Sequence, residues 1–150
     1  MASPRRQGRE VALQILCGVD GNPDFNAAAA LQFYANQVAG SEDEEAGLPA
    51  ADAYDRGFAE SLISRATEQR EQVDDAITKV SRTWRLDRMA RVDRNILRLA
   101  VTEFLFFPEI PARVTINEAV ELAKRYGAAE SPAFVNGLLD SALKTLELRK

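Results

Sequence analysis

The stretch LDRMARVDRNILRLAVTEFLFFPEIP, residues 86–111, decides the fold of this chain. Its apolar residues recur at spacings of three and four, which is typical of an α-helix and not of a strand. They cover more than half of the circumference, so the sequence predicts a central helix that is buried on most sides. Pro108 and Pro111 end this helix. The apolar residues are Val92, Ile96, Leu97, Leu99, Ala100 and Phe104.

Helical spacing continues toward the N-terminus. Ser3 and Pro4 are a suitable cap and first residue for a helix whose apolar stripe runs through residues 11–19. An alanine-rich second helix is expected over residues 25–39, followed by an acidic loop at 41–47. From Tyr54 to Trp84 the apolar positions fit either one long helix or two helices with a break near residues 68–72.

The C-terminal part predicts two more helices. Thr115 and Glu118 form a possible capping box at the start of the first, which Gly127 ends. In the second, Ser131 is the expected cap and Pro132 the first helical residue.

Gly137 falls inside that last helix, where it costs up to about 1 kcal/mol relative to alanine. We therefore expect a neighbouring helix to approach closely there. The pattern as a whole predicts an all-α fold, a compact bundle of six to seven helices. We expect residues 1–150 to form a single domain with a basic N-terminal arm at 1–9.

Composition excludes several classes of function. The 150 residues include no histidine and one cysteine, Cys17, so the usual histidine-based catalytic and metal sites are absent. No phosphate-binding, dinucleotide-binding or nucleophile motif occurs. We therefore expect that the protein is not an enzyme and that it binds no cofactor and no metal. The chain has neither a membrane-spanning stretch nor a secretory signal, which favours the cytoplasm.

The basic residues point to binding. The chain carries a net charge of −4, yet it opens with Arg5, Arg6 and Arg9 and no acid before residue 10. Cations near a helix N-terminus are disfavoured by the helix dipole, and phosphate would offset that repulsion. A hydrated tail is the alternative. The chain has a second basic stretch at residues 79–98. We expect some of its basic side chains to face solvent, some to cap helix ends and some to contact partners.

Three motifs in order resemble the C-terminal half of the NusB family of bacterial transcription antitermination factors. They are RNILRLAVTE at 94–103, INEAVELAK at 116–124 and FVNGLLD at 134–140. The opening RRQGREVALQIL, residues 5–16, resembles the arginine-rich start of that family. The resemblance is strong over 84–146 and loose over 20–80.

The resemblance implies a non-enzymatic RNA-binding protein. Members of the family pair with the ribosomal protein NusE, bind boxA-type single-stranded RNA in nascent ribosomal RNA transcripts, and join the RNA polymerase elongation complex to suppress premature termination. It implies RNA-phosphate contacts for the three arginines of the arm. The expected RNA-binding residues are Arg5, Arg6, Arg9, Glu130, Ser131 and Phe134, and the expected NusE-binding residues are Asp87 and Asp93.

Some alternatives stay open from the sequence. Phe134 either stacks on an RNA base or belongs to the core. Cys17 stands where the family commonly has tyrosine, and the acidic loop at 41–47 has no functional account. The family includes monomers and dimers, so a homodimer is one option. A helical protein-binding adaptor and an accessory domain for an RNA-modifying enzyme are the competing functions.

Overall fold

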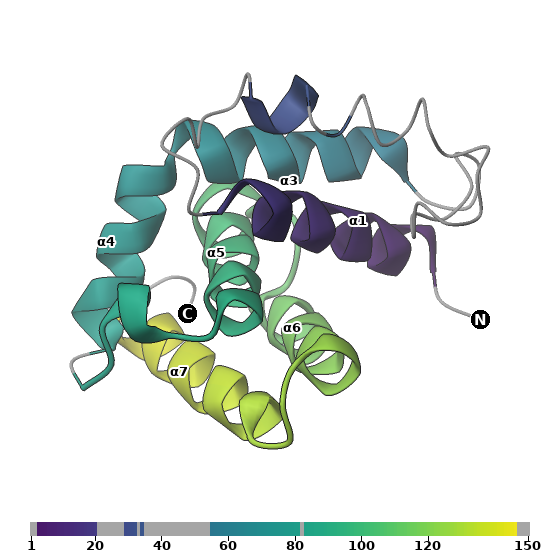
Figure 1. Ribbon diagram of the computed structural model, residues 1–150. Coiled ribbons are helices and arrows are strands. Elements are labelled where there is room, and N and C mark those ends of the chain that lie inside the picture. The colour runs from purple at the N-terminus through teal and green to yellow at the C-terminus, as the bar shows by residue number, and fades with distance from the viewer. Residues whose placement is uncertain (1–2, 21–28, 33, 35–54, 82, 147–150) are drawn as a thin grey trace. The chain divides into compact units, whose positions relative to one another are not determined.

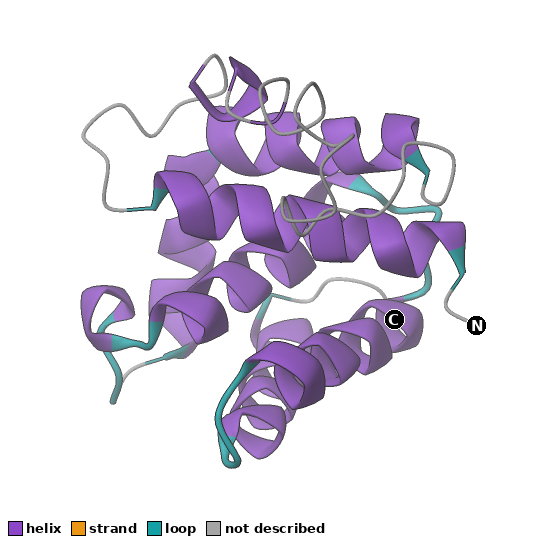
Figure 2. Cartoon of the chain, turned by 45° about the vertical axis from the view of Figure 1, so that its right-hand side comes forward, coloured by secondary structure: helices purple, strands orange, loops and turns teal. Residues whose placement is uncertain are grey.

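The computed structural model describes residues 3–20, 29–32, 34, 55–81 and 83–146. All regular structure in these residues is helical, as Figures 1 and 2 show, which confirms the predicted all-α fold. The chain divides into two compact units, Met1–Glu68 and Gln69–Lys150, and each is described by itself. The single domain over 1–150 stays a prediction. Among the described helices, none is long and apolar enough to cross a membrane.

The first unit begins with helix α1, Pro4–Val19. Its start is the predicted one, because the Ser3 hydroxyl accepts the N–H of Arg6 at 3.1 Å and Pro4 is the first helical residue. The predicted stripe along residues 11–19 is buried. Residues 29–32 and 34 are also helical, whereas the rest of the predicted 25–39 helix and the acidic loop at 41–47 lie outside the described residues.

Helix α3, Arg56–Glu68, packs against α1 within this unit. Asp55 joins the two helices, since its side chain accepts the N–H of Phe58 at 3.0 Å and its own N–H donates to the carbonyl of Pro4 at 3.0 Å. A Cβ at Gly8 would lie 3.2 Å from the carbonyl oxygen of Asp55. Gly8 is therefore needed because the start of α3 approaches α1 closely.

The second unit is built around helix α5, Arg91–Phe106. Helix α5 packs against α4 (Arg70–Val80), α6 (Ala112–Tyr126) and α7 (Ser131–Thr145), and all ten residues from 95 to 104 are buried. The predicted central helix is thus confirmed. A short 3-10 helix, η2 (Leu86–Arg88), precedes it.

The boundary between α3 and α4 resolves the alternative left open by the sequence. Gln69 separates α3 from α4, so two helices and not one cover residues 56–80. Helix α4 ends at Val80, and Trp84 lies beyond it as an exposed residue. The prediction that Trp84 continues the apolar helical pattern is therefore wrong.

Two polar pairs hold the second unit together. The Arg98 guanidinium binds both carboxylate oxygens of Asp74, at 2.9 and 3.2 Å, and so joins α5 to α4. Its remaining nitrogen donates to Asn95 at 3.0 Å. The Thr115 hydroxyl donates to Glu103 at 2.9 Å and joins α6 to α5. These buried groups are satisfied by one another.

The two last helices begin differently from the prediction. Helix α6 starts at Ala112, so Thr115 is a buried residue of its first turns and the predicted capping box with Glu118 is wrong. Glu130 is the cap residue of α7. The Ser131 hydroxyl instead accepts the N–H of Ala128 at 2.9 Å, so Ser131 closes the turn before the helix.

The two glycines of this region, Gly127 and Gly137, lie in different surroundings. Gly127 ends α6 as predicted, in extended conformation, and a Cβ there would lie 2.7 Å from the Ser131 side chain. Gly137 is exposed, and a Cβ there would meet nothing within 4 Å. The predicted close approach of a neighbouring helix at Gly137 is therefore wrong.

Candidate nucleic-acid interface

The basic N-terminal segment forms the first turns of α1. The Arg5 guanidinium carbon lies 4.4 Å from the centre of the Phe58 ring, and that of Arg9 lies 5.0 Å from it. Arg5 also lies near Asp55, with 3.8 Å between Nε and Oδ2. Cations over an aromatic face are stabilised by the ring quadrupole. Two of the three arginines are thus held by residues of α3 and its cap.

The three arginines differ in how much surface they offer to a ligand. Arg9 is only 4% exposed, whereas the Arg5 side chain is half exposed and Arg6 is half-buried. The first turn of α1 contains no acidic residue, so the positive end of the helix dipole and the two outer arginines act together. Sequence reasoning missed Asp55 and Phe58, because both lie about fifty residues away along the chain.

The second basic stretch contains both structural and exposed residues, and its predicted contacts with partners stay a prediction. Arg98 is buried against Asp74, and Arg94 donates to the carbonyl of Met89 at 3.0 Å, so both have structural roles. Arg85 pairs with Asp87, with 3.3 Å between Nε and Oδ1. Arg82 lies outside the described residues. The exposed cations that form no ion pair with a described residue are Lys79, Arg88 and Arg91.

The three predicted residues at the start of α7 do not have equal access to solvent. Glu130 is exposed, and its side chain makes no capping hydrogen bond. Ser131 is buried and uses its hydroxyl within the turn. Phe134 is half-buried, and its ring centre lies 6.3 Å from that of Trp84 in an edge-to-face arrangement. Of the three, Glu130 and Phe134 therefore offer side-chain surface.

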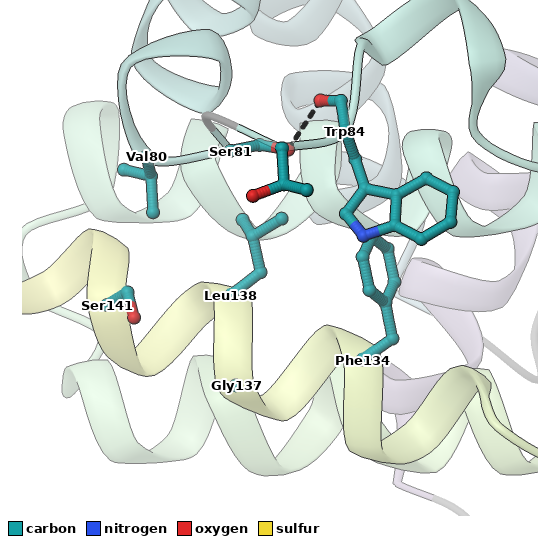
Figure 3. Close-up of a pocket in the computed structure, with 8 residues that line it drawn as sticks. Val80, Ser81, Trp84, Phe134, Gly137, Leu138 and Ser141 are labelled. Atoms are coloured by element: carbon teal, nitrogen blue, oxygen red, sulfur yellow. Dashed lines mark hydrogen bonds between the residues drawn. The ribbon is translucent and has the colours of Figure 1, made fainter.

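A pocket beside this aromatic pair escaped the sequence analysis. Figure 3 shows Phe134 and Leu138 pointing from α7 toward Trp84 and Ser81, which come from the segment after α4. The cavity has a volume of about 240 Å³. Trp84 is 57% exposed, and the Ser81 hydroxyl donates to its carbonyl at 2.6 Å. The remaining lining residues are Val80, Thr83, Gly137 and Ser141.

The two acidic residues expected to face NusE lie in separate surroundings. Asp87 is exposed within η2 and is paired with Arg85. Asp93 lies in the first turn of α5, where the helix dipole stabilises an acid. Among the described residues, no cluster of three histidine, cysteine or acidic side chains is arranged to hold a metal ion.

Comparison with known proteins gives a consistent family. The family model described as the NusB family matches residues 6–144. The chain is 44% identical over 146 residues to the transcription antitermination protein NusB of Geotalea uraniireducens, covering 96% of this chain and 97% of that relative. It is 46% identical over 136 residues to the same protein of Myxococcus xanthus, covering 91% of each chain.

Solved structures agree with the sequence relatives. A structure of NusB from T. maritima superposes with a TM-score of 0.75 at 36% identity, covering 96% of this chain and 93% of that chain. A crystal structure of antitermination factors NusB and NusE in complex with double-stranded RNA superposes with a TM-score of 0.72 at 27% identity, covering 93% and 96%. The chain therefore belongs to the NusB family, whose transcription antitermination factors are RNA-binding proteins and not enzymes.

Proposed function

We propose that this chain pairs with NusE, binds boxA RNA in nascent ribosomal RNA transcripts and suppresses premature termination at the elongating RNA polymerase in the cytoplasm. Family membership and the relative crystallised with NusE and RNA support this function. The observation that carries the RNA-binding part is the acid-free, arginine-rich first turn of α1. A helix N-terminus that carries two accessible arginines attracts phosphate through both its dipole and its side chains.

Within this proposal the arginines have two roles. Arg5 and Arg6 have accessible side-chain surface and act as phosphate contacts. Arg9 is buried on Phe58 and acts as a positioning residue that fixes the ring beneath Arg5. Phosphate contacts of this kind supply affinity without reading sequence, so the preference for boxA comes from base contacts and from the partner protein.

The contact with NusE is proposed through Asp93 and Asp87. Asp93 is at the N-terminal end of α5, and its side chain forms no hydrogen bond or ion pair with another described residue. A basic partner there would gain an ion pair without first breaking one. Asp87 would have to exchange Arg85 for the partner. We therefore expect Asp93 to contribute more than Asp87 to the affinity for NusE.

The test is binding of labelled boxA RNA and a scrambled RNA, with and without NusE, over a range of salt concentrations. We expect boxA to be preferred and NusE to tighten its binding. The Arg5→Ala/Arg6→Ala variant should bind more weakly, with a salt slope shallower by about 1.4, because each lost phosphate contact removes about 0.7 for a single strand. Arg113→Ala, which removes an exposed arginine of α6, is the matched control and should leave the slope unchanged.

Two outcomes contradict the proposal. If wild type binds neither RNA above background even with NusE, the antitermination role is wrong for this chain. If both RNAs bind equally well in the presence of NusE, the protein lacks the sequence preference that a boxA factor requires. A protein that binds NusE but no RNA would instead be a helical adaptor.

A further inference from the structure

We propose that the pocket between Trp84 and α7 receives one unstacked base of single-stranded RNA, with Trp84 as the stacking platform. This inference rests on the proposed function and adds to it a base-binding site and a residue, Trp84, that stacks on a base of the RNA. Four observations carry it: an uncovered tryptophan, a gap in the side chains of α7, the size and chemistry of the pocket, and the charge around it.

Trp84 is available for stacking. Its side chain is more than half exposed, and its contact with Phe134 is edge-to-face, with 77° between the ring planes. In that arrangement the two rings are not stacked on one another, and Trp84 stays 57% exposed. The indole nitrogen donates no hydrogen bond to a described residue, so it can also donate to a base. Tryptophan and phenylalanine faces are the usual platforms for single-stranded bases.

Gly137 keeps the floor of the pocket open. A glycine inside a helix costs up to about 1 kcal/mol relative to alanine, and packing within the free protein does not require it, because a Cβ would meet nothing within 4 Å. Gly137 nevertheless lines the pocket between Phe134 and Leu138. The absence of a side chain at this point leaves room in the pocket for a flat ligand.

The size and chemistry of the pocket fit a base. Its volume of about 240 Å³ is below the usual range of roughly 300–1,000 Å³ for small-molecule sites, so it suits a single ring system and not a larger cofactor. The hydroxyls of Ser81, Thr83 and Ser141 stand among the apolar lining residues. Hydroxyl groups both donate and accept, which matches the polar edge of a base.

The surrounding charge favours RNA over a basic protein segment. Residues 79–91 carry five cations and one acid, within a chain whose net charge is −4. The acid, Asp87, is paired with Arg85, whereas Lys79 and Arg88 are exposed and form no ion pair with a described residue. Cations beside a stacking aromatic follow the backbone of a single strand while the base enters the pocket.

Trp84 is the chain's only tryptophan, so its fluorescence reports on this site alone. The experiment titrates the full chain, with NusE present, with a short labelled boxA RNA. It follows the anisotropy of the label and the tryptophan emission together. We expect the emission to be quenched with the same midpoint as the anisotropy. Inorganic polyphosphate, which has no bases, should bind without quenching.

Substitutions in the pocket distinguish a loss of base stacking from a loss of the folded structure. Trp84→Ala should weaken RNA binding roughly 10-fold, the size of one lost base–aromatic stack, and Trp84→Phe should keep most of the affinity. Gly137→Leu should also weaken binding, because its side chain enters the pocket. Asn136→Leu, an exposed change in the same helix that does not line the pocket, is the matched control. Thermal unfolding of each variant excludes loss of fold as the cause.

The outcomes distinguish this inference from the proposed function. If boxA RNA binds with unchanged tryptophan emission, and Trp84→Ala keeps full affinity, the base pocket is wrong while RNA binding stands. If NusE alone changes the emission and RNA adds nothing, the pocket is a protein contact and the inference is overturned. If wild type binds no RNA at all, the proposed function and this inference fail together.

Discussion

In the first unit the Phe58 ring lies beneath the guanidinium groups of Arg5 and Arg9, whereas in the second unit no described cation lies over the Trp84 ring, which is more than half exposed. Both regions combine arginine with an aromatic residue near a helix end. At Phe58 the chain satisfies the ring internally and uses it to position basic side chains. At Trp84 the ring and the nearby cations are left for a ligand.

The difference shows what an arginine and an aromatic residue need in order to bind a ligand: the ring must be exposed. Phe58 is buried near Gly8, where a Cβ would lie 3.2 Å from the carbonyl oxygen of Asp55 and 3.5 Å from the Phe58 ring. Trp84 follows the end of α4 and borders a helix position, Gly137, where a Cβ meets nothing. Residue types alone do not separate the two cases; the separation depends on which ring faces are covered.

The largest expected difference is in stability. Phe58→Ala should lower the free energy of unfolding by about 3–5 kcal/mol, because it removes a buried aromatic ring and the support of two arginines. Trp84→Ala should lower it by less than about 1 kcal/mol, because most of the side chain is exposed. Urea unfolding of both variants measures this. Equal losses would mean that Trp84 belongs to the core and not to a surface site.

A second comparison contrasts two arginines of the second unit. Arg98→Ala should cost about 3 kcal/mol, since it leaves the Asp74 carboxylate without its ion-pair partner and removes one hydrogen bond from Asn95, whereas Arg88→Ala should change stability by less than about 0.5 kcal/mol. Arg88→Ala should instead weaken RNA binding. The double variant Asp74→Ala/Arg98→Ala should cost less than the sum of the single changes. Additive costs would show that the Asp74–Arg98 pair contributes nothing as a pair.

The smallest expected effects come from two glycines of helix interiors. Gly137→Ala should raise the free energy of unfolding by up to about 1 kcal/mol, because alanine favours the helix and meets no neighbour. Gly8→Ala should lower it by about 1 kcal/mol, because its Cβ would press on the carbonyl oxygen of Asp55. Thermal unfolding of the two variants and the wild type measures both changes in stability. The same sign for both would show that the gap between α1 and α3 adjusts at little cost.

Much of the fold was predictable from local pattern. The stripe of α1, the burial of α5 and the helix end at Gly127 follow from spacing and from the conformational limits of proline and glycine. Two of the errors show where local pattern fails. Thr115 has the spacing of a cap but is buried against Glu103, and Trp84 has the spacing of a core residue but lies past the end of its helix. For Thr115, packing against the neighbouring helix overrode the local signal, whereas for Trp84 the helix ends four residues earlier than the apolar spacing predicts.

The candidate site was less predictable than the fold. The sequence identified the basic opening and, through the family motifs, the start of α7. It gave no sign that Arg5 contacts Asp55 and Phe58, or that the Ser131 hydroxyl accepts a hydrogen bond from the N–H of Ala128. The contacts of Arg5 join segments about fifty residues apart along the chain, which spacing within one helix cannot predict. The Ser131 contact spans only three residues, but it lies in the turn before α7 and not within the helix.

By itself, therefore, the sequence determined the helical class, the buried stripe of α1, the burial of α5 and the family, because these depend on periodicity and on motifs that are local in the chain. Only the tertiary structure decided which arginines are structural, which aromatic ring is uncovered and which glycines the packing requires. Those properties depend on which residues of neighbouring helices contact a side chain. The spacing of residues along one helix does not predict these contacts.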